Sequence, residues 1–257
     1  MQGRTGGLLL LVLSMFLHTS CTLTNSMLDR SVLPEQATVR IPAGWFLMGE
    51  NSGRKSNKPQ RRVYLNAFEI HVTEVTRQDF ALFVAASGYQ APGWQPDGQE
   101  EDDRLPVVGV LWEDADAYCR WLGMRLPTEA EWEKAARGID GRIYPWGEEW
   151  EDRKANTLES GLGELLPVGS FPTGSSPYGL LDMTGNAAEW VADYFDPKYY
   201  TYAPAHNPPG PDQIMDRVLR GGSFAGPAEF GTTYFRDSSH SDRPNVRVGF
   251  RCVKAVD

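Results

Sequence analysis

The segment 107–138, VVGVLWEDADAYCRWLGMRLPTEAEWEKAARG, contains two of the three helices that this chain predicts most clearly. Its second half opens with Thr128-x-x-Glu131, a capping box, and ends at Gly138, the usual kind of helix stop. That helix directs Trp132, Ala135 and Ala136 inward and places Arg137 in its last turn. The helix before it carries apolar residues at helical spacing and ends at Gly123; these residues are Ala115, Tyr118, Cys119 and Leu122.

Upstream of this segment, the pattern predicts a third helix and several strands. Thr76 caps the helix, Asp79 stands three places on, and Gly88 stops it, with Phe80, Phe83 and Val84 on one face. Two short strands are expected at 38–42 and 45–49, around Ala43-Gly44. Residues 62–70 alternate polar and apolar side chains, which indicates one half-buried strand.

From residue 139 onward no long helix is predicted, and short apolar pieces alternate with Gly, Pro, Asn and Asp. The chain contains 26 glycines and 18 prolines, which favours short elements joined by many loops. A length of 257 residues with 41% hydrophobic content supports one substantial core. We therefore expect a single α+β domain whose loops need added stabilisation, such as bound cations and a disulfide.

The charge of the chain excludes one class of partner. A formal charge of −9 and a pI near 5.0 argue against nucleic acid, which requires a basic face. The densest acidic run, 100–103, is expected to be a solvated loop.

The N-terminus has the order of an export signal. Arg4 precedes an apolar run, 8–17, that is too short to span a membrane stably, and Cys21 follows small polar residues. We expect a signal peptide at 1–20, a lipidated Cys21 and a tether at 21–36, although His18 departs from the usual lipoprotein box. Ordinary secreted cleavage and a retained anchor stay open as alternatives. The signal-like segment followed by Cys21 predicts a lipoprotein anchored to a membrane in the bacterial periplasm.

The domain itself, 37–257, resembles the formylglycine-generating enzyme (sulfatase-modifying factor) family. The resemblance rests on seven motifs in order: IPAGWFLMG (41–49), FEIHVTEVTRQDF (68–80), the 107–138 segment, YPWG (144–147), VGSFPTGSSPYGLLDMTGNAAEW (168–190), RGGSF (220–224) and VGFRC (248–252). It implies a loop-rich, C-type-lectin-like fold of mixed α and β structure. It also implies a disulfide between Cys119 and Cys252, for which the residues alone leave two buried free thiols as an alternative.

Enzymes of this family oxidise a substrate cysteine with O2 and copper(I), which two cysteines hold in the loop after Gly-Gly-Ser. The corresponding positions here are Gly226 and Gly231, so the soft thiolates that copper(I) prefers are missing and no copper is expected. An iron-dependent branch draws histidines from an extra domain for which this chain has no room. His71, His206 and His240 show no ligand spacing.

The family's calcium-binding segment survives in part. The resemblance assigns Asp182 and Glu189 as side-chain ligands, and Gly185 and Ala187 as carbonyl ligands. The alternative is a turn in which Glu189 only accepts backbone hydrogen bonds. A second calcium loop would fall on Asn156, Thr157, Ser160 and Leu162, where Ser160 replaces the usual aspartate.

The cleft of the family is expected to persist, lined by Ser223, Phe224, Glu229, Arg236 and Asp242. An Arg236–Asp242 pair would be either a structural bridge or a reader of peptide carboxylates. The chain is therefore predicted to be a binding or accessory module for a protein or peptide partner in the cell envelope. A non-standard oxidoreductase acting in protein or siderophore maturation and a structural envelope component remain as alternatives.

Overall fold

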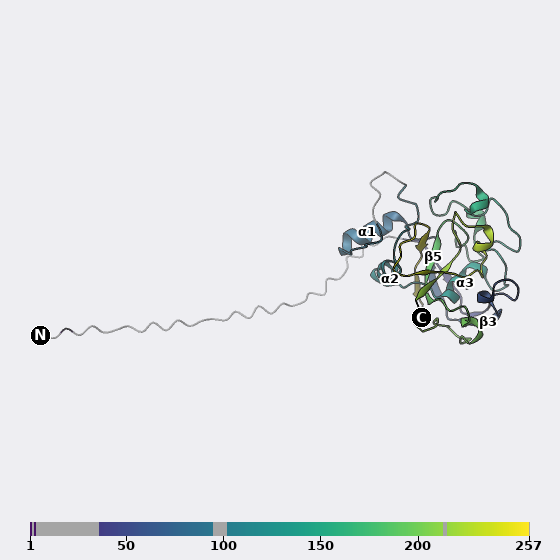
Figure 1. Ribbon diagram of the computed structural model, residues 1–257, viewed down its shortest axis with the longest axis horizontal. Helices are drawn as coiled ribbons and strands as arrows, with labels where there is room; N and C mark the ends of the chain where they lie inside the picture. Colours follow the sequence, from purple (N-terminus) through teal and green to yellow (C-terminus); the bar gives the residue numbers. More distant parts are fainter. Residues whose placement is uncertain (2, 4–35, 95–101, 213–214, 257) are drawn as a thin grey trace. The chain divides into compact units, whose positions relative to one another are not determined.

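The computed structural model describes residues 1, 3, 36–94, 102–212 and 215–256 (Figure 1). A boundary after Ser31 separates the N-terminal residues from the unit Val32–Asp257, whose fold is the subject below. The predicted signal peptide, Cys21 and most of the tether lie outside the described residues. None of the helices in the described ranges is long and apolar enough to cross a membrane.

Three small sheets carry the regular β structure. The first has the order β1–β4–β9, all antiparallel, with β1 at Thr38–Ile41, β4 at Phe68–His71 and β9 at Val253–Ala255. The second is an antiparallel pair of β2 (Gly44–Met48) and β3 (Arg61–Leu65). Strand β9 therefore returns the C-terminal end of the chain to the sheet that the first strands begin.

The third sheet positions the loop that carries the predicted site. Its order is β7–β6–β5–β8, with β7 at Asp237–His240, β6 at Asp216–Arg220, β5 at Ala188–Tyr194 and β8 at Val248–Phe250. Strand β6 is antiparallel to both of its neighbours, and β8 runs parallel to β5. The segment from the end of β6 to the start of β7 therefore leaves and re-enters the sheet at the same end of these two strands.

The three predicted helices are present. Helix α1 (Arg77–Ser87) begins with a Thr76–Asp79 capping box and ends at Gly88, which has a left-handed φ of 69°. Helix α2 spans Trp112–Trp121, and α3 spans Glu129–Arg137 with the predicted Thr128–Glu131 capping box. After α3 the described chain forms only short 3-10 turns between strands, as its glycine and proline content predicts.

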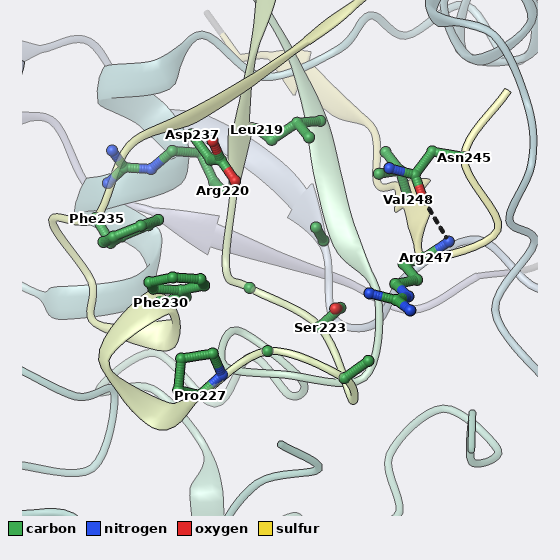
Figure 2. Close-up of a pocket in the computed structure, with 14 residues that line it drawn as sticks. Leu219, Arg220, Ser223, Pro227, Phe230, Phe235, Asp237, Asn245, Arg247 and Val248 are labelled. Atoms are coloured by element: carbon green, nitrogen blue, oxygen red, sulfur yellow. Dashed lines mark hydrogen bonds between the residues drawn. The ribbon is translucent and has the colours of Figure 1, made fainter. Parts of the chain in front are cut away.

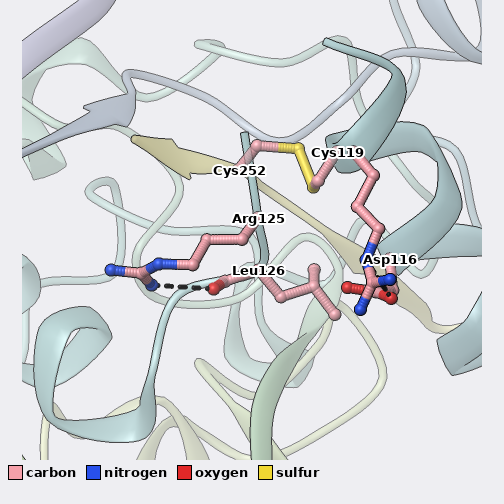
Figure 3. The surroundings of a disulfide bond; sticks show 6 residues. Asp116, Cys119, Arg125, Leu126 and Cys252 are labelled. Carbon is pink, nitrogen blue, oxygen red and sulfur yellow. Dashed lines mark hydrogen bonds and ion pairs between the residues drawn. A yellow bond between two sulfur atoms is a disulfide. The ribbon is translucent and has the colours of Figure 1, made fainter. Parts of the chain in front are cut away.

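Two apolar clusters fill the domain. One packs β1–β4 against α3, and the other packs α1 and α2 against β5 and β8. In the second cluster, a disulfide joins Cys119 of α2 to Cys252, just before β9, with a Cα–Cα distance of 5.6 Å (Figure 3). Both cysteines are fully buried, so the bridge fastens a helix to the C-terminal strands inside the core.

Helix α3 is buried on all sides, although five of its nine residues are charged. Its acidic residues pair with arginines from outside the helix: Glu129 with Arg220 and Arg236, and Glu133 with Arg220. Buried charges require such partners, because an unpaired ion in the interior is strongly destabilising. The charged helix is therefore held by β6 and by the residue that precedes β7.

Two sequence expectations need correction. The single strand predicted at 62–70 is two strands, β3 and β4, that belong to different sheets and are separated by Asn66-Ala67. The backbone N–H of Asn66 donates to the Asn207 side chain, so the chain turns away from the ladder there. Helix α2 ends at Trp121, so Leu122 is its C-cap and not part of the helix, although its side chain still packs, partly buried, against the cluster of Ala115, Tyr118 and Cys119.

Candidate functional site

The loop after β6 lines a cavity of about 230 Å³. Gly221 and Gly222 open the loop with φ values of 87° and 68°, which only glycine adopts readily. A Cβ on Gly222 would also lie 2.9 Å from the carbonyl carbon of Phe230, so the turn is tight on both counts. The Gly-Gly pair therefore folds the chain back over the end of the sheet and leaves the cavity beside it.

The cavity has an aromatic side and a basic side (Figure 2). The rings of Phe230 and Phe235 stack with centroids 4.6 Å apart, and the Arg54 guanidinium lies 4.5 Å from the Phe235 centroid. Arg247 lies on the other side, where its backbone N–H donates to the Asn245 side chain at 3.0 Å (Figure 2).

Three polar side chains of this cavity make no ion pair, and no hydrogen bond to another side chain, among the described residues. Among the described residues, the Arg247 guanidinium makes no hydrogen bond or ion pair. The Ser223 hydroxyl likewise has no hydrogen-bond partner in the described ranges, and Asp237 only accepts from the Ser238 backbone N–H at 2.9 Å. A cation, a hydroxyl and a carboxylate thus remain available to a ligand.

The two positions that would carry thiolates differ in how much room they leave. A Cβ on Gly226 would meet nothing closer than 3.5 Å, and this residue lines the cavity. A Cβ on Gly231 would come within 2.5 Å of Thr184 Cγ2. Thr184 is held in place because its Oγ1 donates to the Gly231 carbonyl at 2.7 Å. A side chain could therefore be added at 226 alone.

The residues present do not fit copper(I). Both thiolate positions are glycines, and Cys119 and Cys252 are joined to each other in the core. The remaining cysteine, Cys21, lies outside the described residues. The site thus lacks the soft sulfur donors that this ion requires.

Of the predicted cleft residues, only Ser223 lines the cavity. Phe224 is half-buried and its backbone N–H donates to the Asn186 carbonyl at 2.9 Å, whereas Glu229 is exposed on the 3-10 turn that follows. Asp242 is exposed on the loop after β7. These three residues frame the loop without entering the cavity.

The expected Arg236–Asp242 pair does not form. Arg236 is 1% exposed and donates to both oxygens of Glu129, at 2.6 and 2.9 Å. Burial by itself lowers the pKa of Arg236, but the charge of Glu129, together with the hydrogen bonds to it and other neighbouring acidic groups, raises the pKa above its usual value. Arg236 therefore belongs to the buried network around α3, in which Glu129 is its carboxylate partner. It does not line the cavity and is not available to a ligand there.

The first predicted calcium set has a donor that the sequence did not reveal. Asp182 has a left-handed φ of 56° and accepts from the Gly169 backbone N–H at 2.6 Å. Glu74 is fully buried, and its Oε2 has no hydrogen-bond partner among the described atoms. Burial, and then the charge of Asp182, raise the pKa of Glu74 well above its usual range. Glu74 and Asp182 thus form a buried acidic pair in the segment where the resemblance places calcium.

Glu189, the other predicted side-chain ligand of calcium, is paired with Arg251. Arg251 Nη2 and Nε donate to it at 2.7 and 2.8 Å, and the Trp132 indole N–H donates at 2.9 Å. Both Glu189 oxygens are therefore satisfied by protein donors. Gly185 and Ala187, the proposed carbonyl donors, lie in the buried turn between Asp182 and β5.

The second predicted calcium loop is closed by its own hydrogen bonds. Ser160 Oγ donates to Thr157 O at 2.7 Å and lies 3.2 Å from Asn156 Oδ1, and Thr157 Oγ1 donates to Glu159 at 2.8 Å. Leu162 is exposed. The side-chain oxygens of this loop are therefore engaged with one another. In the described ranges, no three or more His, Cys, Asp and Glu side chains are grouped as a metal site, at this loop or around Asp182.

Comparison with known proteins gives the fold its family. The model of the "Sulfatase-modifying factor enzyme 1-like domain" matches residues 24–256, most of the chain. The chain belongs to the sulfatase-modifying factor family. A formylglycine-generating enzyme from Streptomyces coelicolor is 36% identical over 85% of this chain and 89% of its own length.

Relatives of this family differ in activity. The mouse protein named "Inactive C-alpha-formylglycine-generating enzyme 2" is 33% identical over 86% of this chain and 87% of its own length. Among solved structures, PvdO from Pseudomonas aeruginosa has a TM-score of 0.74 and 26% identity, and covers 85% of this chain and 94% of its own. The sequence thus matches the sulfatase-modifying factor family, and the fold matches the solved structure of PvdO.

Two of the three available polar groups in the cavity were not predicted from the sequence. Asp237 and Arg247 lie outside the RGGSF and VGFRC motifs that carry the resemblance. Their position at the start of β7 and directly before β8 was a usable signal, since loop residues at strand ends commonly carry binding groups.

Proposed function

We propose that this chain is an exported, membrane-tethered member of the sulfatase-modifying factor family that binds a protein or peptide partner and performs no copper-dependent oxidation. The observation that carries the proposal is the pair of glycines at 226 and 231, with Thr184 filling the space at the second. A site without thiolates cannot hold copper(I) in the way the family resemblance implies.

The cavity supports a binding role. It remains open at about 230 Å³ and offers the Arg247 guanidinium, whose planar fork suits a carboxylate. Asp237 can take a cationic group, and the Phe230–Phe235 stack supplies an apolar wall. A peptide segment with an acidic side chain or a free carboxyl end is a ligand that such a cavity suits.

Two independent features support export, and the first of them also supports tethering. The signal-like segment 1–20 and Cys21 have the order of a lipoprotein N-terminus. The Cys119–Cys252 disulfide belongs to the chemistry of oxidising compartments such as the bacterial periplasm. A Cys21→Ser variant is expected to leave the membrane fraction while keeping its fold.

A hard cation, calcium, is proposed at Asp182 with the carbonyls of Gly185 and Ala187. The buried Glu74, which lies close enough to Asp182 to feel its charge, supports this proposal. A bound cation would neutralise two carboxylates that otherwise stay together in a low dielectric. The proposal does not extend to Asn156, Thr157, Ser160 and Leu162.

The experiment for the oxidation claim uses a cysteine-containing sulfatase peptide with copper(I) and O2. We expect no formylglycine from this chain, while the Streptomyces coelicolor enzyme, run in parallel, should form it. Formylglycine production by this chain would overturn the proposal in favour of a non-standard oxidoreductase. Loss of one thiol from each peptide without formylglycine would likewise indicate oxidation by another route.

The partner claim is tested with a photo-crosslinking residue at position 223 in cells. We expect a defined periplasmic adduct that disappears in an Arg247→Glu variant. Arg243→Glu is the matched control, because Arg243 is exposed on the same segment but does not line the cavity. Adducts that are equal from position 254, on the exposed side of β9, would show that the cavity is not the binding surface.

A further inference from the structure

A second cavity, of about 440 Å³, lies between the turn that joins β1 to β2 and the chain that follows α3. Its walls are mainly apolar and include Pro42, Trp45, Ile139, Pro177 and Tyr178. Trp45 is 40% exposed and Ile139 is 66% exposed, so both side chains present apolar surface at the opening. Neither the loop after β6 nor any predicted site residue lines this cavity.

Lys134 of α3 forms the charged part of the wall. The residue is 1% exposed, and its ammonium group donates to the carbonyls of Pro42 at 2.6 Å and Gly44 at 3.1 Å. No carboxylate lies within ion-pair distance of it in the part of the chain that the structure describes. Every other charged residue of this helix has an ion-pair partner of opposite sign.

A buried ammonium group without a counter-ion is unusual. Lysine is rarely buried unless it is paired, because removing the charge from water is costly. The group has three N–H donors, and two backbone carbonyls account for two of them. Burial lowers the Lys134 pKa to about 8, which agrees with the absence of a neighbouring carboxylate. The site therefore holds one donor and one positive charge for an acceptor that the protein does not supply.

The other charged groups of the cavity do not compete for such an acceptor. Asp140 and Arg142 neutralise each other through two hydrogen bonds, at 3.0 Å from Nε and 2.6 Å from Nη2. The Arg142 Nη1 group donates to the Pro145 carbonyl at 3.1 Å. Lys134 is thus the one uncompensated charge among the described residues that line this cavity.

Trp45 packs against two rings at the opening. Its ring makes edge contacts with Tyr64, with centroids 5.5 Å apart, and with His206, with centroids 4.9 Å apart. A preformed aromatic wall lowers the cost of binding because little side-chain freedom is lost. Small-molecule sites commonly combine such apolar walls with one well-placed polar group.

We propose that this cavity binds a small monoanion with an apolar body, a carboxylate on a ring or on a short acyl chain. The carboxylate accepts from the Lys134 ammonium group, and the apolar body lies against Trp45, Ile139 and Tyr178. The site is separate from the cavity of the β6 loop, so it stands or falls independently of the proposed partner-binding role.

The test measures binding of phenylacetate and octanoate to the purified full chain by calorimetry. Phenylacetamide and octanamide, which keep the apolar body and lose the charge, are the ligand controls. We expect each acid to bind at least about tenfold more tightly than its amide. Tighter binding of octanoate would identify acyl chains as the class, and tighter binding of phenylacetate would identify aromatic acids.

Two variants locate the site. Lys134→Met keeps the length and packing of the side chain and should abolish the preference for the acids, and Trp45→Ala should weaken all four compounds. Lys254→Met is the matched control, because Lys254 is exposed on β9, and it should bind as the parent does. Equal binding of acids and amides, no binding of either, or an unchanged preference in Lys134→Met would overturn the proposal.

A second measurement covers the case in which Lys134→Met does not fold. In the parent chain, octanoate should slow reductive methylation of Lys134 several-fold, read residue by residue by mass spectrometry. Methylation of Lys254 should be unchanged in the same sample. An equal rate at Lys134 with and without octanoate would contradict the assignment.

Discussion

The methyl group of Thr184 lies where a side chain on residue 231 would begin, since a Cβ on Gly231 would come within 2.5 Å of Thr184 Cγ2. The hydroxyl of the same threonine donates to the Gly231 carbonyl at 2.7 Å, so the methyl group cannot turn away without losing that bond. Thr184 is buried. The second thiolate position of the family is therefore filled by packing from the 182–186 turn.

This packing predicts different costs for adding one methyl group at the two glycines. Neither Gly226 nor Gly231 has a positive φ, so alanine adds volume without backbone strain. Gly231→Ala should lower the free energy of unfolding by about 1–3 kcal/mol through overpacking, and Gly226→Ala should change it little. Urea denaturation measures both.

Thr184→Ser supplies the control, because it removes the methyl group and keeps the hydroxyl. Combined with Gly231→Ala, it should recover most of the lost stability, a non-additive result that contacting residues are expected to give. If the two glycines tolerate alanine equally, the packing explanation is wrong.

The position of Arg236 leads to a second prediction. Its guanidinium pairs with Glu129 inside the domain, whereas Asp242 is exposed. Arg236→Met leaves Glu129 with one buried cation fewer and should destabilise the fold by about 3–5 kcal/mol. Asp242→Asn should have almost no effect. Similar losses from both variants would restore the Arg236–Asp242 pair that the sequence suggested.

The burial of His71 predicts that the free energy of unfolding depends on pH in the acidic range. The residue is 2% exposed, and burial, followed by the charge of Arg251, lowers its pKa to about 3. Below the unfolded-state pKa of about 6.5, His71 binds a proton in the unfolded chain but stays neutral in the folded chain. The stability should therefore fall as the pH drops from about 6.5 toward 3, by up to about 1.4 kcal/mol per pH unit from this group.

A His71→Phe variant isolates that contribution. In this pH window it should reduce the slope of the unfolding free energy against pH by up to about 1.4 kcal/mol per pH unit, the contribution of one proton. The same slope in the parent and in His71→Phe would show that His71 titrates normally in the fold.

The cation proposal predicts a chelator effect. Removing calcium should lower the Tm of the parent, because the cation binds the folded state only. Asp182→Ala should have a lower Tm and no further response to chelator. Ser160→Ala, in the second loop, should respond as the parent does. Identical melting curves with and without chelator would refute calcium binding at Asp182.

The sequence predicts the parts of this fold that local chemistry determines. Thr76 with Asp79 and Thr128 with Glu131 mark two helix starts, and Gly88 marks a helix end, because capping satisfies backbone groups within a few residues. The family resemblance, carried by motifs spread over the whole domain, predicts the architecture and the disulfide partners.

The pairing of charges across the domain was not predictable in the same way. Arg236 and Glu129 are 107 residues apart and meet only in the folded core. Glu74 approaches Asp182 across a similar separation in sequence, so no local pattern signals it. The break between β3 and β4 likewise depends on Asn207, which contacts Asn66 from far along the chain.

We infer that this member of the family keeps the fold without a copper(I) site, and the proposed function rests on that inference. It is tested most directly by titrating cuprous ion, against a competing chelator, into a purified Cys21→Ser chain with its Cys119–Cys252 disulfide intact. We expect no complex of one cuprous ion per chain. Tight one-to-one loading under these conditions would contradict it.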